Sequence, residues 1–173
     1  MVNNIYKVLD FNSDWLKVKC KPIHEITEEV FDVSEKMART MYNEKGIGLS
    51  ANQVGIDMRL VVMDLSKSKN SLEVYINPEI LDKSKKLANS KEGCLSVPGY
   101  QDTVKRYKTV TVEYTDLFGN KQVEEMSGLQ AYCIQHEIDH LNGKIFVDKL
   151  SPNKQKFAKF KSNLFISATK GLP

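Results

Sequence analysis

Several residue types are scarce in this chain, and each shortage limits what the protein can be. Its 173 residues include only three cysteines, three histidines and one tryptophan. No stretch approaches the ~18 apolar residues of a membrane span, and the N-terminus lacks the basic region and apolar run of an export signal. Cysteines in a chain without such a signal favour free thiols in a reducing compartment. We therefore expect a cytoplasmic protein without disulfides and without a membrane partner.

The excess of positive charge is also small. Lys and Arg number 25 against 22 Asp and Glu, for a net charge of +3. This is too little to indicate nucleic-acid binding by itself. With 41% hydrophobic and 27% charged residues, the composition is that of an ordinary globular protein. The length predicts one domain over residues 1–173.

Two of the three histidines stand four residues apart, in the segment His-Glu-Ile-Asp-His at 136–140. On a helix, His136 and His140 project from one face, so both can reach one metal ion. Glu137 lies about 100° around the helix from His136, close enough to handle a proton on metal-bound water. The pattern therefore predicts a hydrolytic metal site.

The flanks of this motif predict a buried helix, with Ser127 as its N-cap and Gly143 as its stop. Apolar and ligand positions follow two stripes, one of Leu129, Cys133, His136 and His140 and one of Ile134, Ile138 and Leu141. A helix that is apolar on two faces is central in the fold. This disfavours the alternative of a surface helix with two stray histidines, because buried imidazoles need partners.

A catalytic metal site needs a third protein ligand and one open position. Cys133 has apolar neighbours and is better read as a core or pocket residue. Cys20 lies in a lysine-rich, strand-like stretch at 17–21 and is predicted to be incidental. Cys94 lies in the Gly- and Pro-punctuated segment 92–99, where the backbone can approach a site closely. Cys94 is therefore the predicted third ligand.

Three separated segments resemble the signature motifs of the peptide deformylases. They are Gly-Ile-Gly-Leu-Ser-Ala-Asn-Gln at 46–53, Glu-Gly-Cys-Leu-Ser at 92–96 and Gln-His-Glu-Ile-Asp-His-Leu-Asn-Gly at 135–143. Their order and spacing also fit, and the resemblance runs from about residue 5 to about residue 165. It implies a metal-dependent hydrolase that removes the formyl group from the N-terminal formyl-methionine of newly synthesised polypeptides.

The resemblance also implies roles for individual residues. Glu137 acts as general acid and base, while the side-chain amide of Gln53 and the backbone N–H of Leu95 stabilise the oxyanion. The alternative for Gln53 is a solvated glutamine in a loop. The resemblance implies Fe²⁺ as the natural ion, although two imidazoles and a thiolate also suit Zn²⁺, and Ni²⁺ or Co²⁺ can substitute.

Substrate binding is a further expectation from the family. The segment of Gly46, Ile47 and Gly48 pairs with the extended peptide, because glycines allow a close backbone approach. Ile47, Leu129, Tyr132 and Cys133 occupy the positions that line the methionine pocket, with ordinary core packing as the alternative. The chain departs from the family at three of its positions, Ser50 in place of the usual Ala, Tyr132 in place of an aliphatic residue and Gln101 in place of arginine.

Arg106 matches a second family arginine, and with Glu92 and Asp139 it is expected to form an ion network that supports the metal ligands. Two other classes of function remain as alternatives. A zinc peptidase shares the His-Glu-x-x-His motif, but its third ligand follows the helix, and no histidine follows His140. A metal-stabilised binding module would close the site with a fourth ligand and would need neither Glu137 nor Gln53.

The remaining pattern predicts an α+β fold, with antiparallel sheets around the central metal-binding helix and a C-terminal helix. We expect a helix over residues 26–44 that buries Val30, Val33, Met37 and Met41. Strands are expected at 59–64, 72–76, 108–114 and 121–126, with a hairpin turn at 116–120.

The last segment, residues 151–173, opens with Ser151-Pro152, which starts a helix. Phe157, Phe160 and Leu164 are its predicted packed edge. The segment carries no acidic residue and five lysines, for a net charge of +5, at Lys154, Lys156, Lys159, Lys161 and Lys170. Its predicted role is contact with the ribosome, where the formylated substrate emerges, and the alternative is a solvated basic face.

Overall fold

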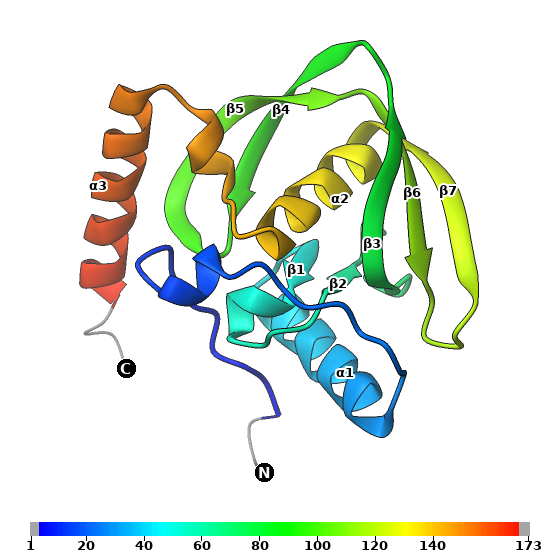
Figure 1. Ribbon diagram of the computed structural model, residues 1–173. Helices are drawn as coiled ribbons and strands as arrows, with labels where there is room; N and C mark the ends of the chain where they lie inside the picture. Colours follow the sequence, from blue (N-terminus) through cyan, green and yellow to red (C-terminus); the bar gives the residue numbers. More distant parts are fainter. Residues whose placement is uncertain (1–3, 170–173) are drawn as a thin grey trace.

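The main sheet of the molecule has five antiparallel strands in the order β1-β2-β3-β6-β7 (Figure 1). The computed structural model describes residues 4–169. The strands are β1 (Gly48–Ser50), β2 (Leu60–Met63), β3 (Glu73–Lys83), β6 (Thr109–Thr115) and β7 (Lys121–Ser127). The predicted strands at 59–64, 108–114 and 121–126 are confirmed within a residue at each end.

Strand β2 carries the hydrophobic core on both of its faces. Leu60 and Val62 pack with helix α1 (Glu28–Asn43), whereas Val61 and Met63 pack with helix α2 (Gly128–Leu141). Successive side chains of a strand point to opposite faces, so a strand covered on both sides needs four apolar residues in a row. The helix predicted at 26–44 is confirmed, with its four apolar positions buried.

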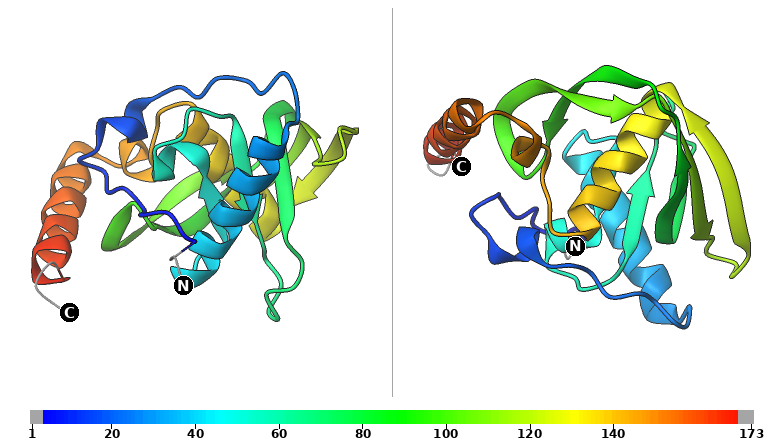
Figure 2. Two further views of the ribbon diagram at one scale, coloured as in Figure 1. Left: turned by 90° about the horizontal axis from the view of Figure 1, so that it is seen from below. Right: turned by 45° about the horizontal axis from the view of Figure 1, so that its top comes forward.

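A second, two-stranded sheet lies across α2 from the main sheet. It is the hairpin of β4 (Leu87–Cys94) and β5 (Val97–Tyr107), which the sequence did not predict. Figure 2 shows α2 between this hairpin and the strands of the main sheet. The predicted α+β class, with antiparallel sheets around a central helix and a C-terminal helix, is confirmed.

Strand β3 is longer than the predicted segment at 72–76. It continues to Lys83 through register shifts on both sides of residues 79–80. Asn77 has a positive φ of 52°, and its side chain bonds both backbone groups of Ile23. Pro78 follows, and a proline within a strand is tolerated at such irregular places. Because of this irregularity, the sequence pattern did not predict the second half of the strand.

The C-terminal helix α3 (Pro152–Thr169) packs on β5 by a different face from the one predicted. Its buried residues are Ala158 and Ser162. The predicted packed edge is wrong, because Phe157, Phe160 and Leu164 are each more than half exposed. Small residues allow the helix to lie close to β5, where a Cβ on Gly99 would come within 2.8 Å of Phe165. Lys170 lies outside the described residues.

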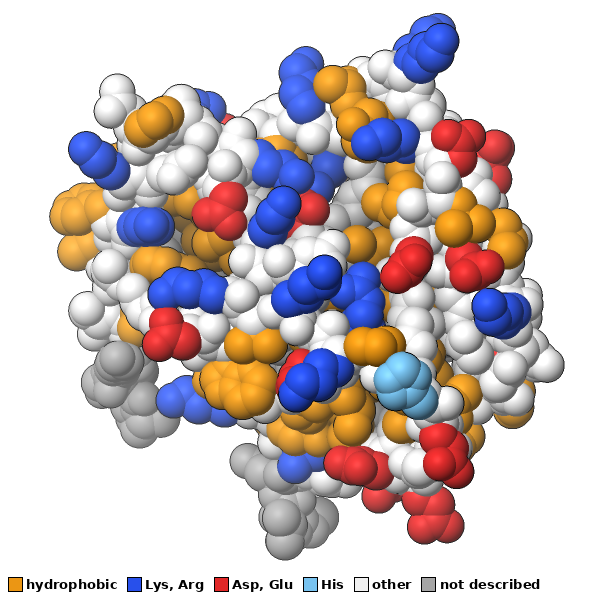
Figure 3. Space-filling model, in the orientation of Figure 1, with side chains coloured by type: hydrophobic (Ala, Val, Ile, Leu, Met, Phe, Trp, Pro, Cys, Tyr) orange, Lys and Arg blue, Asp and Glu red, His pale blue; other side chains and the backbone are white. Residues whose placement is uncertain are grey.

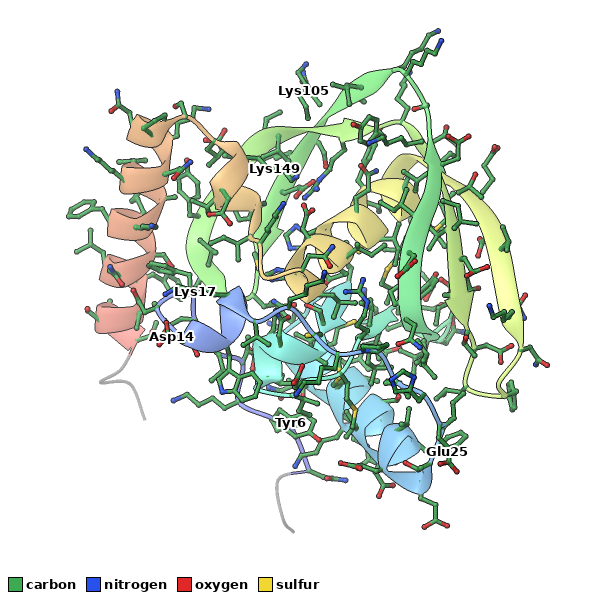
Figure 4. The ribbon with its side chains drawn as sticks, in the orientation of Figure 1. Tyr6, Asp14, Lys17, Glu25, Lys105 and Lys149 are labelled. Atoms are coloured by element: carbon green, nitrogen blue, oxygen red, sulfur yellow. The ribbon has the colours of Figure 1, made fainter. Side chains whose placement is uncertain are left out.

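The N-terminal part of the chain corrects another prediction. Residues 17–21 make a single bridge, between Lys19 and Asn142, rather than a strand. Cys20 is buried in the core against the sheet, so it has a packing role instead of being incidental. Before this stretch lies a short 3-10 turn, η1 (Asp14–Lys17), whose two end residues form the exposed ion pair labelled in Figure 4. Within residues 4–169, no helix is long and apolar enough to cross a membrane.

Candidate metal centre

Helix α2 is placed by glycines at both ends. Gly128 has a φ of +58° and turns the chain from β7 into the helix, and Gly143 has a φ of +72° where the helix has ended. Neither conformation suits an ordinary side chain. A Cβ on Gly143 would also lie 2.4 Å from the carbonyl oxygen of Lys17. The predicted stop is therefore confirmed, whereas Ser127 occupies the N-cap position without a side-chain hydrogen bond.

Three side chains from two elements converge beside this helix. The Sγ of Cys94, at the end of β4, lies 3.2 Å from the Nε2 of His140, which lies 3.2 Å from the Nε2 of His136. Ligands bound at 2.0–2.3 Å to one tetrahedral ion lie about 3.3–3.8 Å apart. The donor set and its spacing fit a single divalent metal ion, and Cys94, His136 and His140 form a metal-binding group.

An ion network holds one of the ligands from behind. The Nδ1 of His136 bonds Glu92 at 2.9 Å, and Arg106 grips both oxygens of Glu92 at 2.8 and 2.9 Å. Arg106 also bonds Asp139, so the predicted network is present. Burial alone would raise the pKa of Glu92, but hydrogen bonds from Arg106 and His136 outweigh it and lower this pKa to about 2. Such partners fix the orientation of a metal-ligating histidine.

The network reaches the surface through a residue that sequence reasoning missed. Lys149, labelled in Figure 4, belongs to the 3-10 turn η3 (Phe146–Lys149) between α2 and α3. Its Nζ lies 3.1 Å from Asp139. No local pattern marks this lysine, because the contact depends on how η3 folds back over α2.

Glu137 lies beside the three ligands and is almost fully buried. Burial is the main cause that raises its pKa to about 7, and the neighbouring His136 opposes the shift. A Cβ on Gly48 would lie 2.6 Å from the Oε1 of Glu137, so a glycine is needed for this carboxyl to fit. A buried carboxyl with a pKa near neutrality can both take and return a proton at pH 7.

Gln53 lies next to Cys94, in the 3-10 turn η2 (Ala51–Val54). Its exposed fraction is 1%, so it is not the solvated loop residue of the alternative reading. The Nε2 lies 3.1 Å from the Oγ of Ser96 and 3.5 Å from the Sγ of Cys94. The amide therefore presents an N–H group next to the ligand cluster.

A cavity of about 710 Å³ opens onto these residues. Strand β1 is the edge of the main sheet, and the segment of Gly46, Ile47 and Gly48 lines the cavity. All of the predicted pocket residues line it as well, including Leu129, which is 57% exposed rather than buried. Tyr100 and Val97 were not predicted, although their place just after the second motif could have indicated them.

Comparison with known proteins decides the family. The model of the polypeptide deformylase family matches residues 5–156, which is most of the chain. The chain belongs to the polypeptide deformylase family. The resemblance in its three motifs is thereby confirmed by a match over residues 5–156, and the peptidase and binding-module alternatives lose their support.

Individual deformylases are similar along nearly their full lengths. The peptide deformylase of Afipia carboxidovorans is 45% identical over 153 residues, which are 87% of this chain and 90% of that protein. A crystal structure of a peptide deformylase from Legionella pneumophila superposes with a TM-score of 0.94 at 41% identity, covering 98% and 99% of the two chains. A deformylase from Synechococcus elongatus in complex with actinonin gives 0.89 at 36% identity, over 94% and 90%.

Proposed function

We propose that this chain deformylates the N-terminal formyl-methionine of newly synthesised polypeptides with one Fe²⁺ ion held by Cys94, His136 and His140. As a member of the polypeptide deformylase family it is a metal-dependent hydrolase. The observation that carries the proposal is the convergence of three ligand atoms beside a buried carboxyl and a buried amide. The same ligands could hold Zn²⁺, Ni²⁺ or Co²⁺, because imidazole and thiolate suit all of these ions.

The protein side chains divide the chemistry among themselves. Cys94, His136 and His140 would hold a divalent ion, which when bound would make a water molecule more acidic at neutral pH. Glu137 takes the proton from the attacking water and later delivers it to the leaving amine. The Nε2 of Gln53 and the backbone N–H of Leu95 donate hydrogen bonds to the formyl oxygen, which becomes an oxyanion when water attacks the formyl carbon. Both donors border the cavity.

The substrate lies against the free edge of β1. An extended peptide adds to this edge as a further strand, with main-chain hydrogen bonds to residues 46–48. Its methionine side chain enters the cavity between Ile47, Leu129, Tyr132 and Cys133. These apolar walls supply the preference for methionine, and Gln101 at the cavity mouth contacts the peptide beyond it.

The reaction is tested by comparing three peptides with the metal-loaded protein. Formyl-Met-Ala-Ser should be hydrolysed, whereas acetyl-Met-Ala-Ser should not, because its extra methyl group meets the backbone near Gly48 and Glu137. Unmodified Met-Ala-Ser tests for peptidase activity. Comparable cleavage of the acetyl peptide would contradict the closed site, and cleavage of the Met-Ala bond would contradict the reaction itself.

A second part of the proposal concerns where the enzyme works, in the cytoplasm at the ribosome. Figure 3 shows lysine and apolar side chains interspersed over α3, at the left of the view. Lys154 is paired with Asp102, whereas Lys156, Lys159 and Lys161 make no ion pair among the described residues. These three lysines can replace counterions on ribosomal RNA, so binding should weaken with salt.

The test compares the wild-type protein with a triple Lys→Gln variant at 156, 159 and 161 for co-sedimentation with ribosomes at low and moderate salt. A matched control replaces three exposed lysines elsewhere on the surface, Lys67, Lys105 and Lys108. The first variant alone should lose sedimentation and keep its activity on short peptides. Equal sedimentation of all three proteins would eliminate ribosome contact through α3.

A further inference from the structure

One hydroxyl group contacts the buried amide that lies next to the metal ligands. Ser50, at the end of β1, is fully buried. Its backbone N–H donates to the Oε1 of Gln53 at 3.0 Å, and its hydroxyl donates to the same oxygen at 2.9 Å. We propose that Ser50 is a positioning residue, which holds the Gln53 amide with its Nε2 facing the reacting atoms. This inference rests on the oxyanion role proposed for Gln53.

The backbone N–H of Ser50 fixes which way the amide points, and the hydroxyl adds a second donor to the same oxygen. A flipped amide would set its NH₂ group against this N–H and leave a buried backbone donor unpaired. At the other end, the Nε2 has Ser96 as its acceptor at 3.1 Å. The amide is therefore held from both ends, between the first and the second sequence motif.

The Ser50 side chain shares a strand face with Gly48. Alternate residues of a strand point to the same face, so Gly48 and Ser50 both face α2, where Gly48 is in tight contact with Glu137. The Oε2 of Glu137 has no hydrogen-bond partner among the described residues. The single hydrogen of the Ser50 hydroxyl is donated to Gln53, so we expect Ser50 to act on turnover through the amide rather than through Glu137.

An alanine at this position keeps the backbone N–H donor and removes the hydroxyl. The Gln53 amide is then held by one donor instead of two, and the loss appears when the oxyanion forms rather than when the peptide binds. The net value of one hydrogen bond corresponds to about a 2- to 12-fold change. We expect Ser50→Ala to lower kcat by this factor, with KM for formyl-Met-Ala-Ser and bound metal unchanged.

A double-mutant cycle separates positioning from general packing. It uses the metal-loaded wild type, Ser50→Ala, Gln53→Ala and the double variant, all assayed on formyl-Met-Ala-Ser. Ser50→Ala should lower kcat in the wild type and leave it unchanged within two-fold in the Gln53→Ala background. Ser34→Ala is the matched control, because Ser34 is a buried serine of α1 whose hydroxyl donates to Val30 far from the cavity. It should lower the melting temperature without lowering kcat.

The outcomes also separate this inference from the proposed function. If Gln53→Ala keeps the wild-type kcat, the oxyanion role of Gln53 and the positioning role of Ser50 are both wrong. If Gln53→Ala loses activity and Ser50→Ala does not, only the positioning role is wrong. An equal loss from Ser50→Ala in both backgrounds also overturns it, since Ser50 would then act independently of Gln53.

Discussion

Helices α2 and α3 have similar lengths and opposite relations to the rest of the molecule. Nine of the 14 residues of α2 are buried, among them two histidines, a glutamate and a glutamine. Only two of the 18 residues of α3 are buried, and both are small. The first helix is enclosed by both sheets, while the second lies on the outside of one hairpin. The buried polar side chains are therefore concentrated on α2, where the surrounding sheets hold them in place.

The two helices carry residues in unusual places for different reasons, with charged residues buried around α2 and apolar residues exposed on α3. Around α2, the charges of the network balance, because the two carboxylates of Glu92 and Asp139 face Arg106 and Lys149. On α3, Phe160 and Leu164 remain more than half exposed to water. Substitutions on α2, or in residues that contact it, should change turnover and metal binding. Substitutions on α3 should mainly change the stability of the fold and the contacts of its surface.

The largest effect is expected from Cys94→Ala, which removes one of the three ligands held against α2. The variant should lose its metal and, with it, all measurable deformylation, as checked by elemental analysis and the peptide assay. Cys20→Ala is the control, because Cys20 is a free cysteine that lies in the core away from the cluster. A Cys94→Ala protein with a full complement of metal would contradict the ligand assignment.

Glu137→Gln should keep the metal and lose turnover. General acid–base catalysis contributes roughly 10²–10⁴-fold, and a glutamine of the same shape cannot carry the proton. The measurement is kcat/KM on formyl-Met-Ala-Ser with the metal content determined on the same sample. Retention of more than about a tenth of the wild-type kcat/KM would contradict the acid–base role of Glu137.

Glu92→Gln should weaken metal binding without abolishing it. The substitution leaves Arg106 with an uncharged partner and His136 with a weaker acceptor, and losses of this kind are about 10- to 100-fold in metal affinity. Competition with a chelator measures the affinity. Lys149→Gln, at the exposed end of the same network, should change it much less. Equal effects of the two variants would mean that the network does not act through His136.

On α3 the expected effects are on stability. Ala158→Leu forces a larger side chain against β5 and should destabilise the fold by about 1–3 kcal/mol. Phe160→Ala removes a large but exposed side chain and should cost less than about 0.5 kcal/mol. Thermal unfolding measures both, and the peptide assay should remain unchanged. The reverse order of stabilities would restore the packed edge predicted from the sequence.

The smallest effect concerns the ion pair that ties α3 to β5. Hydrogen bonds from Lys154 and Tyr100 lower the pKa of Asp102 to about 2. A carboxyl whose pKa is lower in the folded protein contributes stability above its ordinary pKa near 4 and loses it as the pH falls towards 2. Exposed pairs of this kind contribute about 0.2–1 kcal/mol. Lys154→Gln should therefore lower the melting temperature slightly at pH 6 and not at pH 2. An equal decrease at both pH values would exclude the ion pair as its cause.

The sequence revealed α2 and its ligands more fully than it revealed α3. The positions of His136, Glu137 and His140 follow from the local geometry of one helix, and the Gly-rich context of Cys94 indicated a close approach. The packed face of α3 depends on the shape of β5 at Gly99, which no spacing within the helix encodes. The hairpin of β4 and β5 was missed because β4 is rich in residues that are uncommon in strands.

Other features depend on contacts between distant segments. The reach of Lys149 to Asp139 needed the fold, as did the clamp on Gln53 by Ser50 and Ser96. The single domain over residues 1–173 and the individual catalytic and pocket roles stay predictions, which the variants above address. The family itself could be recognised from three short motifs, because their chemistry requires fixed residue types at fixed spacing.

The contact between Gly48 and Glu137 restricts how this enzyme could escape an inhibitor. A ligand that pairs with the edge of β1 bonds to peptide groups, which every amino acid supplies, so most side-chain changes leave those bonds intact. A side chain at position 48 would be the direct way to block such a ligand, yet its Cβ would lie 2.6 Å from the Glu137 carboxyl. A substitution of Gly48 that blocked the inhibitor would therefore also disable the enzyme. Resistance should instead arise from substitutions in the walls of the cavity or from a larger amount of enzyme.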